Sequence, residues 1–520
     1  MEQASNAMRS YRDAEAMRLL DAALALKPGD RDAANAKGSL LGKLGRFDDA
    51  LAVFRKGLAA NPNAAELHYN AAFALQCLGQ FEEAANEYAS SLKLQPNFPE
   101  ALSNQGLTLN AIGRRQEALA SYDEALRQRP NFARALNNRG ITLSELRRLD
   151  EAVASYNAAI ALDPAYREAF NNRGSAYGDM GRLDDALADY GRALAIEPRY
   201  AEAHVNEAFT RLMLGDFDRG WQKYEWRQEG QFGLGPRPTE RPEWRGENIA
   251  GRTLLLIGEQ GLGDTLHFCR YAPILANKGV KVILEVQPAL KPLLSGMRGV
   301  QSVIAIGEPR PAYDAHRALL SMPFMLKTTL AAVPSDVPYL AADPSRVETW
   351  RARLAGLGSA LKVGIAWQGS RGTKLDLGRS ILLREFAALA MPGVQLISLQ
   401  KGDGVEQLEN LPPGMNVHVL GKDFDSGSGA FLDTAAVMES LDLVVTSDTA
   451  IAHLAGALAR PVWVALKTVP DWRWMLSRED SPWYPTMRLF RQKNWGDWQE
   501  VFARIARDLA ALAGGTHGKD

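Results

Sequence analysis

Cysteine is scarce in this sequence, with Cys77 and Cys269 as the only two among 520 residues. Two cysteines cannot form a disulfide framework, and two isolated positions lack the paired spacing that zinc sites need. Neither a disulfide-rich scaffold nor a cysteine-based zinc module is therefore expected. A chain of this length is too long for one core, so two or three domains are expected.

The sequence also lacks a surplus of charge of either sign and any long apolar run. Its 60 lysines and arginines balance 61 aspartates and glutamates, for a formal net charge of -1. Nucleic-acid-binding proteins normally carry a basic surplus or stripe, so that class is not favoured. No apolar run is long enough to span a bilayer, and the first residues hold no apolar signal core. We expect a cytoplasmic protein without a membrane span.

What the first half does contain is an internal repeat. Prolines recur every 34 residues, each at a point where a helix must stop: Pro28, Pro62, Pro96, Pro130, Pro164 and Pro198. A fixed period of this length is typical of stacked helical hairpins that bury their apolar faces against one another.

Three further phases of the same period have physical reasons. Glycine permits the tight turn between two helices, alanine lets the helices approach closely, and an aromatic ring fills the wedge between hairpins. The glycines are Gly45, Gly79, Gly113, Gly181 and Gly215, with Arg147 as the exception; the alanines are Ala50, Ala84, Ala118, Ala152 and Ala186; the aromatic residues are Phe54, Tyr88, Tyr122, Tyr156, Tyr190 and Tyr224. These residues resemble the tetratricopeptide repeat family. The resemblance implies an all-α superhelix of about six repeats over residues 1–227 that binds a protein or peptide.

A fourth phase consists of asparagines in the first helix of each repeat: Asn70, Asn104, Asn138, Asn172 and Asn206. Asparagine is unfavourable inside a helix, so five at one phase need a compensating role. One hypothesis is that they bind the backbone of an extended acceptor peptide, an arrangement that resembles the asparagine ladder of O-linked N-acetylglucosamine transferase. The alternative is that they bridge neighbouring repeats and contact no ligand.

The second half has a different pattern. Residues 228–250 are rich in glycine and proline and predict an irregular linker. Short β-rich runs then alternate with helical stretches, at 253–257, 280–286, 300–305, 361–367, 394–399, 441–446 and 461–465. This alternation predicts parallel sheets wound on both faces, in two Rossmann-like units over 251–345 and 346–515. Two such units facing a cleft form the α/β architecture that is called GT-B among glycosyltransferases.

The first strand runs into a loop, Gly261-Leu-Gly263-Asp264, that opens a helix. Glycines at this point let a substrate approach the backbone at the helix N-terminus. A carboxylate here can act as the base that an inverting sugar transfer needs at the acceptor hydroxyl. The alternative for Asp264 is a simple helix cap, which is a common fate of aspartate at this position.

The loop resembles its counterpart in glycosyltransferase family 9, the lipopolysaccharide heptosyltransferases, whose matching aspartate is the proposed general base. A second segment, from Thr446 to Leu458, resembles the strand–turn–helix of the same family. The resemblance implies that a donor diphosphate rests on the helix N-terminus near Asp448 and Thr449. His453 then either reaches a phosphate or orients Asp448; the alternative is a satisfied, half-buried histidine.

Other predicted donor-binding residues follow further strands of the second unit. A basic residue near the first of these strands would neutralise the leaving diphosphate, and Lys374 and Arg379 remain equal candidates. The remaining members of the predicted set are Trp367, Gly369, Ser380, Gln400, Lys401 and, after the last predicted strand, Arg473. Asp423-Phe-Asp425 resembles an Asp-x-Asp metal motif only superficially. No metal and no cofactor besides a nucleotide diphosphate sugar as co-substrate are expected.

The leading hypothesis is an inverting, metal-independent glycosyltransferase with Asp264 as base and a protein or peptide acceptor held by the repeats. A first alternative is a scaffold whose transferase-like domain is inactive, because Ala450 stands where the family usually has glycine. A second alternative keeps the enzyme but gives it a lipid-linked or glycan acceptor.

Overall fold

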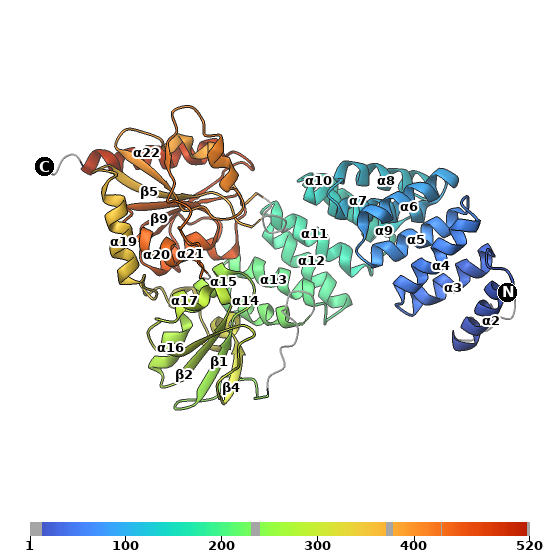
Figure 1. Cartoon of the computed structure of the whole chain (residues 1–520), viewed down its shortest axis with the longest axis horizontal. Coiled ribbons are helices and arrows are strands. Elements are labelled where there is room, and N and C mark those ends of the chain that lie inside the picture. The colour runs from blue at the N-terminus through green and yellow to red at the C-terminus, as the bar shows by residue number, and fades with distance from the viewer. Residues whose placement is uncertain (1–12, 230–239, 371–377, 428, 517–520) are drawn as a thin grey trace. The chain divides into compact units, whose positions relative to one another are not determined.

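The computed structural model describes residues 13–229, 240–370, 378–427 and 429–516 (Figure 1). The chain divides into two compact units, Met1–Tyr200 and Ala201–Asp520. The division falls before the end of the repeat pattern, so the last helical hairpin belongs to the second unit.

Consecutive antiparallel helices make up the first unit, in which each helix packs against its neighbours along the chain. They are α2 (Asp13–Leu26), α3 (Arg31–Lys43), α4 (Phe47–Ala60), α5 (Ala65–Cys77), α6 (Phe81–Leu94), α7 (Pro99–Ala111), α8 (Arg115–Gln128), α9 (Ala133–Glu145), α10 (Leu149–Leu162), α11 (Arg167–Asp179) and α12 (Leu183–Ile196). The predicted tetratricopeptide superhelix is confirmed.

The turns inside the hairpins need a left-handed backbone, which explains the glycine phase. The φ angles of Gly45, Gly79, Gly113 and Gly181 lie between 74° and 81°. Arg147, the exception to the glycine phase, adopts the same region with φ 61°. Its guanidinium binds Asp179 in the next repeat at 2.7 Å, a contact that glycine does not offer.

The six aromatic rings of the repeats are buried, as expected. They pack against a further set of small residues, also repeated every 34 residues, which the sequence analysis missed. Four of the six rings lie against a glycine 16 residues earlier, and alanine stands at this phase for the other two. A Cβ atom added at Gly140 would lie 2.5 Å from Cε1 of Tyr156, and one at Gly106 would lie 2.7 Å from Cε1 of Tyr122. Small residues at this phase therefore set how closely the helices of a repeat approach.

The second unit begins with the hairpin of α13 (Ala201–Met213) and α14 (Phe217–Tyr224), followed by the short helix η1 (Glu225–Gln228). Trp221 of α14 is buried, and its indole donates a hydrogen bond of 3.0 Å to the carbonyl of Thr328. Arg227 is fully buried and binds both carboxylate oxygens of Glu259, at 3.2 and 2.7 Å. This hairpin is part of the hydrophobic core of the second unit.

The described part of the predicted linker is packed rather than free. Trp244 and Ile249 are buried, and the Trp244 amide donates to the carbonyl of His316 at the edge of the first sheet. The prediction of irregular structure holds for residues 240–250, which contain no helix and only an isolated bridge to His316.

Two parallel sheets follow. The first has four strands in the order β3-β2-β1-β4, and the second has six in the order β10-β9-β8-β5-β6-β7. They are β1 (Thr253–Ile257), β2 (Lys281–Val286), β3 (Val300–Ala305), β4 (Ala315–Ala318), β5 (Leu361–Ala366), β6 (Val394–Ser398), β7 (Val417–His418), β8 (Leu443–Ser447), β9 (Val462–Leu466) and β10 (Met487–Arg491). Counted from β5, the second sheet has the doubly wound order 3-2-1-4-5-6, and the first sheet has its 3-2-1-4 portion. The predicted GT-B type of fold is confirmed.

The helices of these units are short except for α19 and α22. They are α15 (Leu262–Phe268), α16 (Tyr271–Asn277), α17 (Lys291–Leu294), α18 (Met322–Met325), α19 (Pro344–Ala355), α20 (Leu432–Met438), α21 (Ala450–Ala457) and α22 (Trp498–Thr516), with 3-10 turns that include η6 (Leu383–Leu389) and η8 (Trp472–Trp474). Within the part of the chain that the structure describes, no helix is both long and apolar enough to cross a membrane.

A matched pair of substitutions tests the small-residue phase. Gly140→Val should lower the stability of the first unit by about 1–3 kcal/mol, because the added methyl groups overlap the ring of Tyr156. Gly191→Val, at a helical glycine with open space around it, should leave the melting temperature unchanged or slightly higher. Thermal unfolding followed by circular dichroism measures both. Equal effects at the two sites would contradict the assigned role.

Two truncations test the unit boundary. Residues 201–520 should fold cooperatively by themselves, whereas residues 228–520 should not. The shorter fragment lacks α13 and α14, so the core loses Trp221, and Glu259 is left without Arg227. Near-ultraviolet circular dichroism and thermal unfolding of the two fragments provide the measurement. A well-folded shorter fragment would show that the hairpin is dispensable.

Candidate active site

The candidate site is at the carboxyl ends of three strands, β1 in the first sheet and β5 and β8 in the second. Each of these strands ends beside the point where the strand order of its sheet reverses, which is where doubly wound sheets bind ligands. Helices α15 and α21 begin there and pack against each other (Figure 1). The contact is close at Gly263, where an added Cβ would lie 3.1 Å from Cδ2 of His453 and 3.5 Å from Cα of Ala450.

Asp264, the predicted base, lies in the first turn of α15. Its Oδ2 accepts a hydrogen bond from the Gly261 amide at 2.9 Å, so the capping role considered from the sequence is present. Its Oδ1 accepts from Nη2 of Arg473 in the other Rossmann-like unit at 2.5 Å, so the side chain also faces that unit. Burial raises the pKa of Asp264 above its ordinary value, and the positive charge of Arg473 opposes this rise.

Arg473 was predicted to contact a donor phosphate, and the structure places it against Asp264. Its Nη1 binds Oδ1 of Asp471 at 3.0 Å, and its guanidinium lies over the ring of Trp472 at 4.4 Å. The ring of Phe268, at the end of α15, is 5.4 Å from the same guanidinium. Arg473 is thus held between two carboxylates and two aromatic rings.

Asp448 and Thr449 follow β8. Thr449 is the N-cap residue of α21, and Asp448 is 8% exposed. Burial, and next the nearby charge of Asp471, raise the pKa of Asp448 to about 6, although Arg379 acts in the opposite direction. A carboxyl group with this pKa changes its charge close to neutral pH.

His453 is a buried, satisfied histidine, which is close to the alternative considered from the sequence. Its Nδ1 is 3.0 Å from the hydroxyl of Tyr484, and its ring stacks on Trp474 with 5.3 Å between ring centroids. The same hydroxyl is 3.1 Å from Nδ1 of His267. Burial lowers the pKa of His453 well below its ordinary value, so the ring is neutral and supplies no positive charge for a phosphate.

Gly369 and Arg379 lie together beside Thr449. A Cβ added at Gly369 would be 3.2 Å from Nη2 of Arg379 and 3.7 Å from Cγ2 of Thr449. Arg379 therefore remains a candidate for the leaving phosphate, and its buried Nε has no hydrogen-bond partner among the described residues. Ser380 is half-buried next to it. Lys374, the other basic candidate, lies outside the described residues.

Trp367 and Gln400 support the loop that carries Gly369. Trp367 is fully buried, and Gln400 accepts hydrogen bonds from the amides of Trp367 and Gln368 at 2.9 and 3.1 Å. The Gln400 amide donates to the carbonyls of Gln368 and Asp403. Lys401 donates to the carbonyl of Phe424 at 2.6 Å. These contacts give all three residues structural roles, and their binding of a donor stays a prediction.

Three of the predicted acceptor-binding asparagines bridge neighbouring repeats. Each donates its side-chain N–H to the residue 35 positions earlier: Asn70 to Asn35 at 2.6 Å, Asn104 to Tyr69 at 3.1 Å, and Asn172 to Asn137 at 3.0 Å. Asn138 is half-buried at the same phase, and Asn206 belongs to the second compact unit. The bridging alternative is thus observed for these three, and peptide binding through their oxygens stays a prediction.

The two aspartates of the superficial metal motif have structural partners. Asp423 binds Arg353 at 2.7 Å, and Asp425 accepts hydrogen bonds from the amide and hydroxyl of Thr434 at the start of α20. Residues that the sequence analysis did not assign to the site include Asp471 and Tyr484. Both follow the last predicted strand in a segment rich in aromatic residues, and no spacing rule connects them to Asp264.

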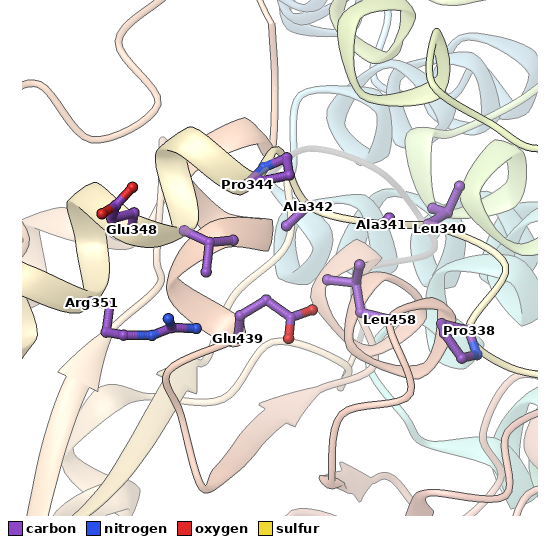
Figure 2. A pocket seen from close by; sticks show the side chains of 10 residues that line it. Pro338, Leu340, Ala341, Ala342, Pro344, Glu348, Arg351, Glu439 and Leu458 are labelled. Carbon is purple, nitrogen blue, oxygen red and sulfur yellow. The ribbon is translucent and has the colours of Figure 1, made fainter.

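Two cavities lie elsewhere in the second unit. One, of about 570 Å³, lies beside α19 and is lined by Leu340, Val347, Arg351 and Glu439 among others (Figure 2). The other, of about 320 Å³, lies beside Trp244. Neither is lined by a predicted site residue.

Comparison with known families agrees with this arrangement. Models of the tetratricopeptide repeat match residues 2–65, 41–104, 121–154, 145–181 and 168–200. The model of glycosyltransferase family 9 (heptosyltransferase) matches residues 387–467. The chain thus matches tetratricopeptide repeat models in its first half and the glycosyltransferase family 9 model in part of its second half. This heptosyltransferase-like match includes Asp448, Thr449 and His453 but does not reach Asp264.

One similar protein is FlbA of Caulobacter vibrioides (strain ATCC 19089 / CIP 103742 / CB 15), with 30% identity over 336 residues. The alignment covers 58% of this chain and 54% of FlbA, so the chain spans about half the length of this curated relative. Among solved structures, TTC0263, a repeat protein of Thermus thermophilus, is 28% identical with a TM-score of 0.31, covering 35% of this chain and 99% of that chain. A repeat protein of Parabacteroides merdae ATCC 43184 is 21% identical with a TM-score of 0.39, covering 44% and 91%. These two likenesses are too partial to support a functional inference.

The raised pKa of Asp448 predicts a pH-dependent stability. Because the folded-state pKa of about 6 exceeds the ordinary 3.8, this group destabilises the fold progressively as the pH rises from about 4 through 6. Asp448→Asn cannot ionise, so it should be more stable than the wild type at pH 8, by up to roughly 3 kcal/mol, and equally stable near pH 4. Asp423→Asn, at an exposed carboxylate whose pKa is lowered by Arg353, should give no such gain. Thermal unfolding between pH 4 and 8 measures the difference.

Proposed function

We propose that residues 251–516 catalyse the transfer of a sugar, with inversion, from a nucleotide diphosphate sugar to an acceptor recruited by the tetratricopeptide repeats. The acceptor is a protein or peptide, and the reaction takes place in the cytoplasm without a metal or further cofactor. The main support is that Asp264, in the first turn of α15 after β1, contacts Arg473 of the other Rossmann-like unit, while the adjacent Gly263 lies against the start of α21.

The chemistry follows from charge and geometry. Asp264 removes the proton from the acceptor hydroxyl as the oxygen attacks the anomeric carbon from the face opposite the diphosphate. The C–O bond to the diphosphate breaks as the new bond forms, which inverts the configuration. The side chain of Asp264 keeps 22% of its surface exposed, so its remaining lone pairs are accessible to a hydroxyl.

The donor diphosphate needs positive charge and hydrogen-bond donors on the side opposite the base. The amides at the start of α21, next to Thr449, offer donors and the positive end of the helix dipole. Arg379, beside Gly369 and Thr449, adds a full charge that stabilises the leaving group without a metal.

A protein or peptide acceptor is supported by the repeats themselves. Their inter-repeat hydrogen bonds use an N–H of Asn70 and of Asn172, and each of these side chains keeps a carbonyl oxygen that can accept from a peptide amide. Successive first helices also expose Phe73 and Leu107, 34 residues apart, at 44% and 39% of their surface. Such a row of apolar and carbonyl groups suits an extended chain.

Asp264→Asn tests the function. The amide oxygen of asparagine keeps the cap to Gly261, but the side chain cannot take a proton. Release of nucleoside diphosphate from a panel of UDP, GDP and ADP sugars should fall by roughly 10²–10⁴-fold, while calorimetric donor affinity should change by less than about threefold. Asp343→Asn, at another helix cap with a 3.0 Å bond to Arg346, should leave both quantities unchanged.

Other results would favour the alternatives. Full activity of Asp264→Asn would refute the assignment of the base. Absence of binding to every nucleotide sugar would favour the inactive scaffold. Undiminished transfer to a minimal glycan acceptor by residues 201–520 would favour a lipid-linked or glycan acceptor, with the repeats left for docking of partners.

A further inference from the structure

The burial of Asp264 opposes the negative charge that a general base needs. A general base must be ionised before it can accept a proton, yet burial of a carboxylate favours its neutral form. Its neighbours include one like charge, Asp471, and the phenol of Tyr224, besides the neutral ring of His453 near Gly263. The cationic groups that act on it are Arg473 and Arg379.

Arg473 is the cation in direct contact. Nη2 of Arg473 donates to Oδ1 of Asp264 at 2.5 Å, so the guanidinium and the carboxylate are in direct, charge-assisted contact. The pair joins residues 209 positions apart, one from each Rossmann-like unit. Arg473 is 6% exposed, so water screens this interaction little.

The backbone that carries Arg473 is itself fixed. Asp471 caps η8 by accepting from the Arg473 amide at 3.0 Å, and it also binds the guanidinium. The next residues are held by Arg491 of β10, which donates to the carbonyls of Trp474 and Met475 at 3.0 and 2.8 Å. Met475 has a φ of 53°, a conformation that a non-glycine residue adopts only when its surroundings impose it.

The surroundings of Arg473 also restrict its choice of partner. Its guanidinium lies against the rings of Trp472 and Phe268 and binds the carboxylates of Asp471 and Asp264. A residue held in this way is suited to fix the direction of a carboxylate.

We propose that Arg473 is a positioning residue that holds the Asp264 carboxylate in one direction and supplies the counter-charge beside it. This inference rests on the proposed function for its catalytic part. The role differs from the phosphate contact that the sequence suggested, because Arg473 acts through Asp264 and need not touch the donor.

The first measurement does not depend on activity. In Arg473→Ala, Asp264 keeps its burial but loses its counter-charge, so its pKa should rise. The stability of this variant should therefore fall between pH 5 and 8 more steeply than that of the wild type. Addition of Asp264→Asn should remove the extra fall. If the changes in melting temperature at pH 8 caused by Arg473→Ala and by Asp264→Asn simply add in the double variant, the two side chains are not coupled and the proposal fails.

The second measurement is the pH profile of nucleoside diphosphate release. In Arg473→Ala the acidic limb should move to higher pH, so that the ratio of the rate at pH 8 to that at pH 6 rises about tenfold or more. Arg473→Lys keeps the charge and should recover part of the wild-type profile. Arg353→Ala, which removes the surface pair with Asp423 at 2.7 Å, serves as a control and should leave the profile unchanged.

The outcomes separate this inference from the proposed function. An unshifted acidic limb in Arg473→Ala, together with a large loss of calorimetric affinity for UDP or GDP, would overturn the proposal in favour of a phosphate contact. If the wild type turns over no nucleotide sugar, the proposed function fails, and the stability measurement alone then decides whether Arg473 holds Asp264 in its charged form.

Discussion

The close packing of α15 against α21 is the contact on which the geometry of the candidate site depends. Both helices start at strand ends next to a reversal in strand order, and Gly263 allows their first turns to touch. A Cβ atom at that position would lie 3.1 Å from Cδ2 of His453, which is a tight contact. Asp264 lies in the first turn of α15 and contacts Arg473, which is carried by η8 of the other Rossmann-like unit.

A buried polar network surrounds this contact and makes it specific. Tyr484 connects the histidines of the two helices. Arg270 is buried and donates to the carbonyls of Pro334 and Trp483 and to the hydroxyl of Tyr339. A buried polar group that loses its hydrogen-bond partner lowers the stability of the folded state. The two Rossmann-like units are therefore expected to keep one mutual arrangement, with Asp264 and Arg473 on facing sides.

The sequence was sufficient for most of the fold and for only part of the site. The 34-residue period and the alternation of strands and helices are local signals, and they predicted the repeats and seven of the strands. Strands β4, β7 and β10 were missed because they are short or carry charged residues such as Arg317 and Arg488. The pairing of Asp264 with Arg473 has no local signal, since 209 residues separate them. The asparagine phase was correctly recognised as unusual, but only the coordinates show that Asn70, Asn104 and Asn172 bond to the preceding repeat.

The inclusion of α13 and α14 in the second compact unit bears on how such a chain can evolve. In a solenoid each repeat contacts only its neighbours, so repeats can be gained or lost upstream while the end that carries Trp221 and Arg227 stays the same. The number of repeats and the residues of the second unit are then open to separate selection. Chains that share this end are free to differ in the number of hairpins that precede it.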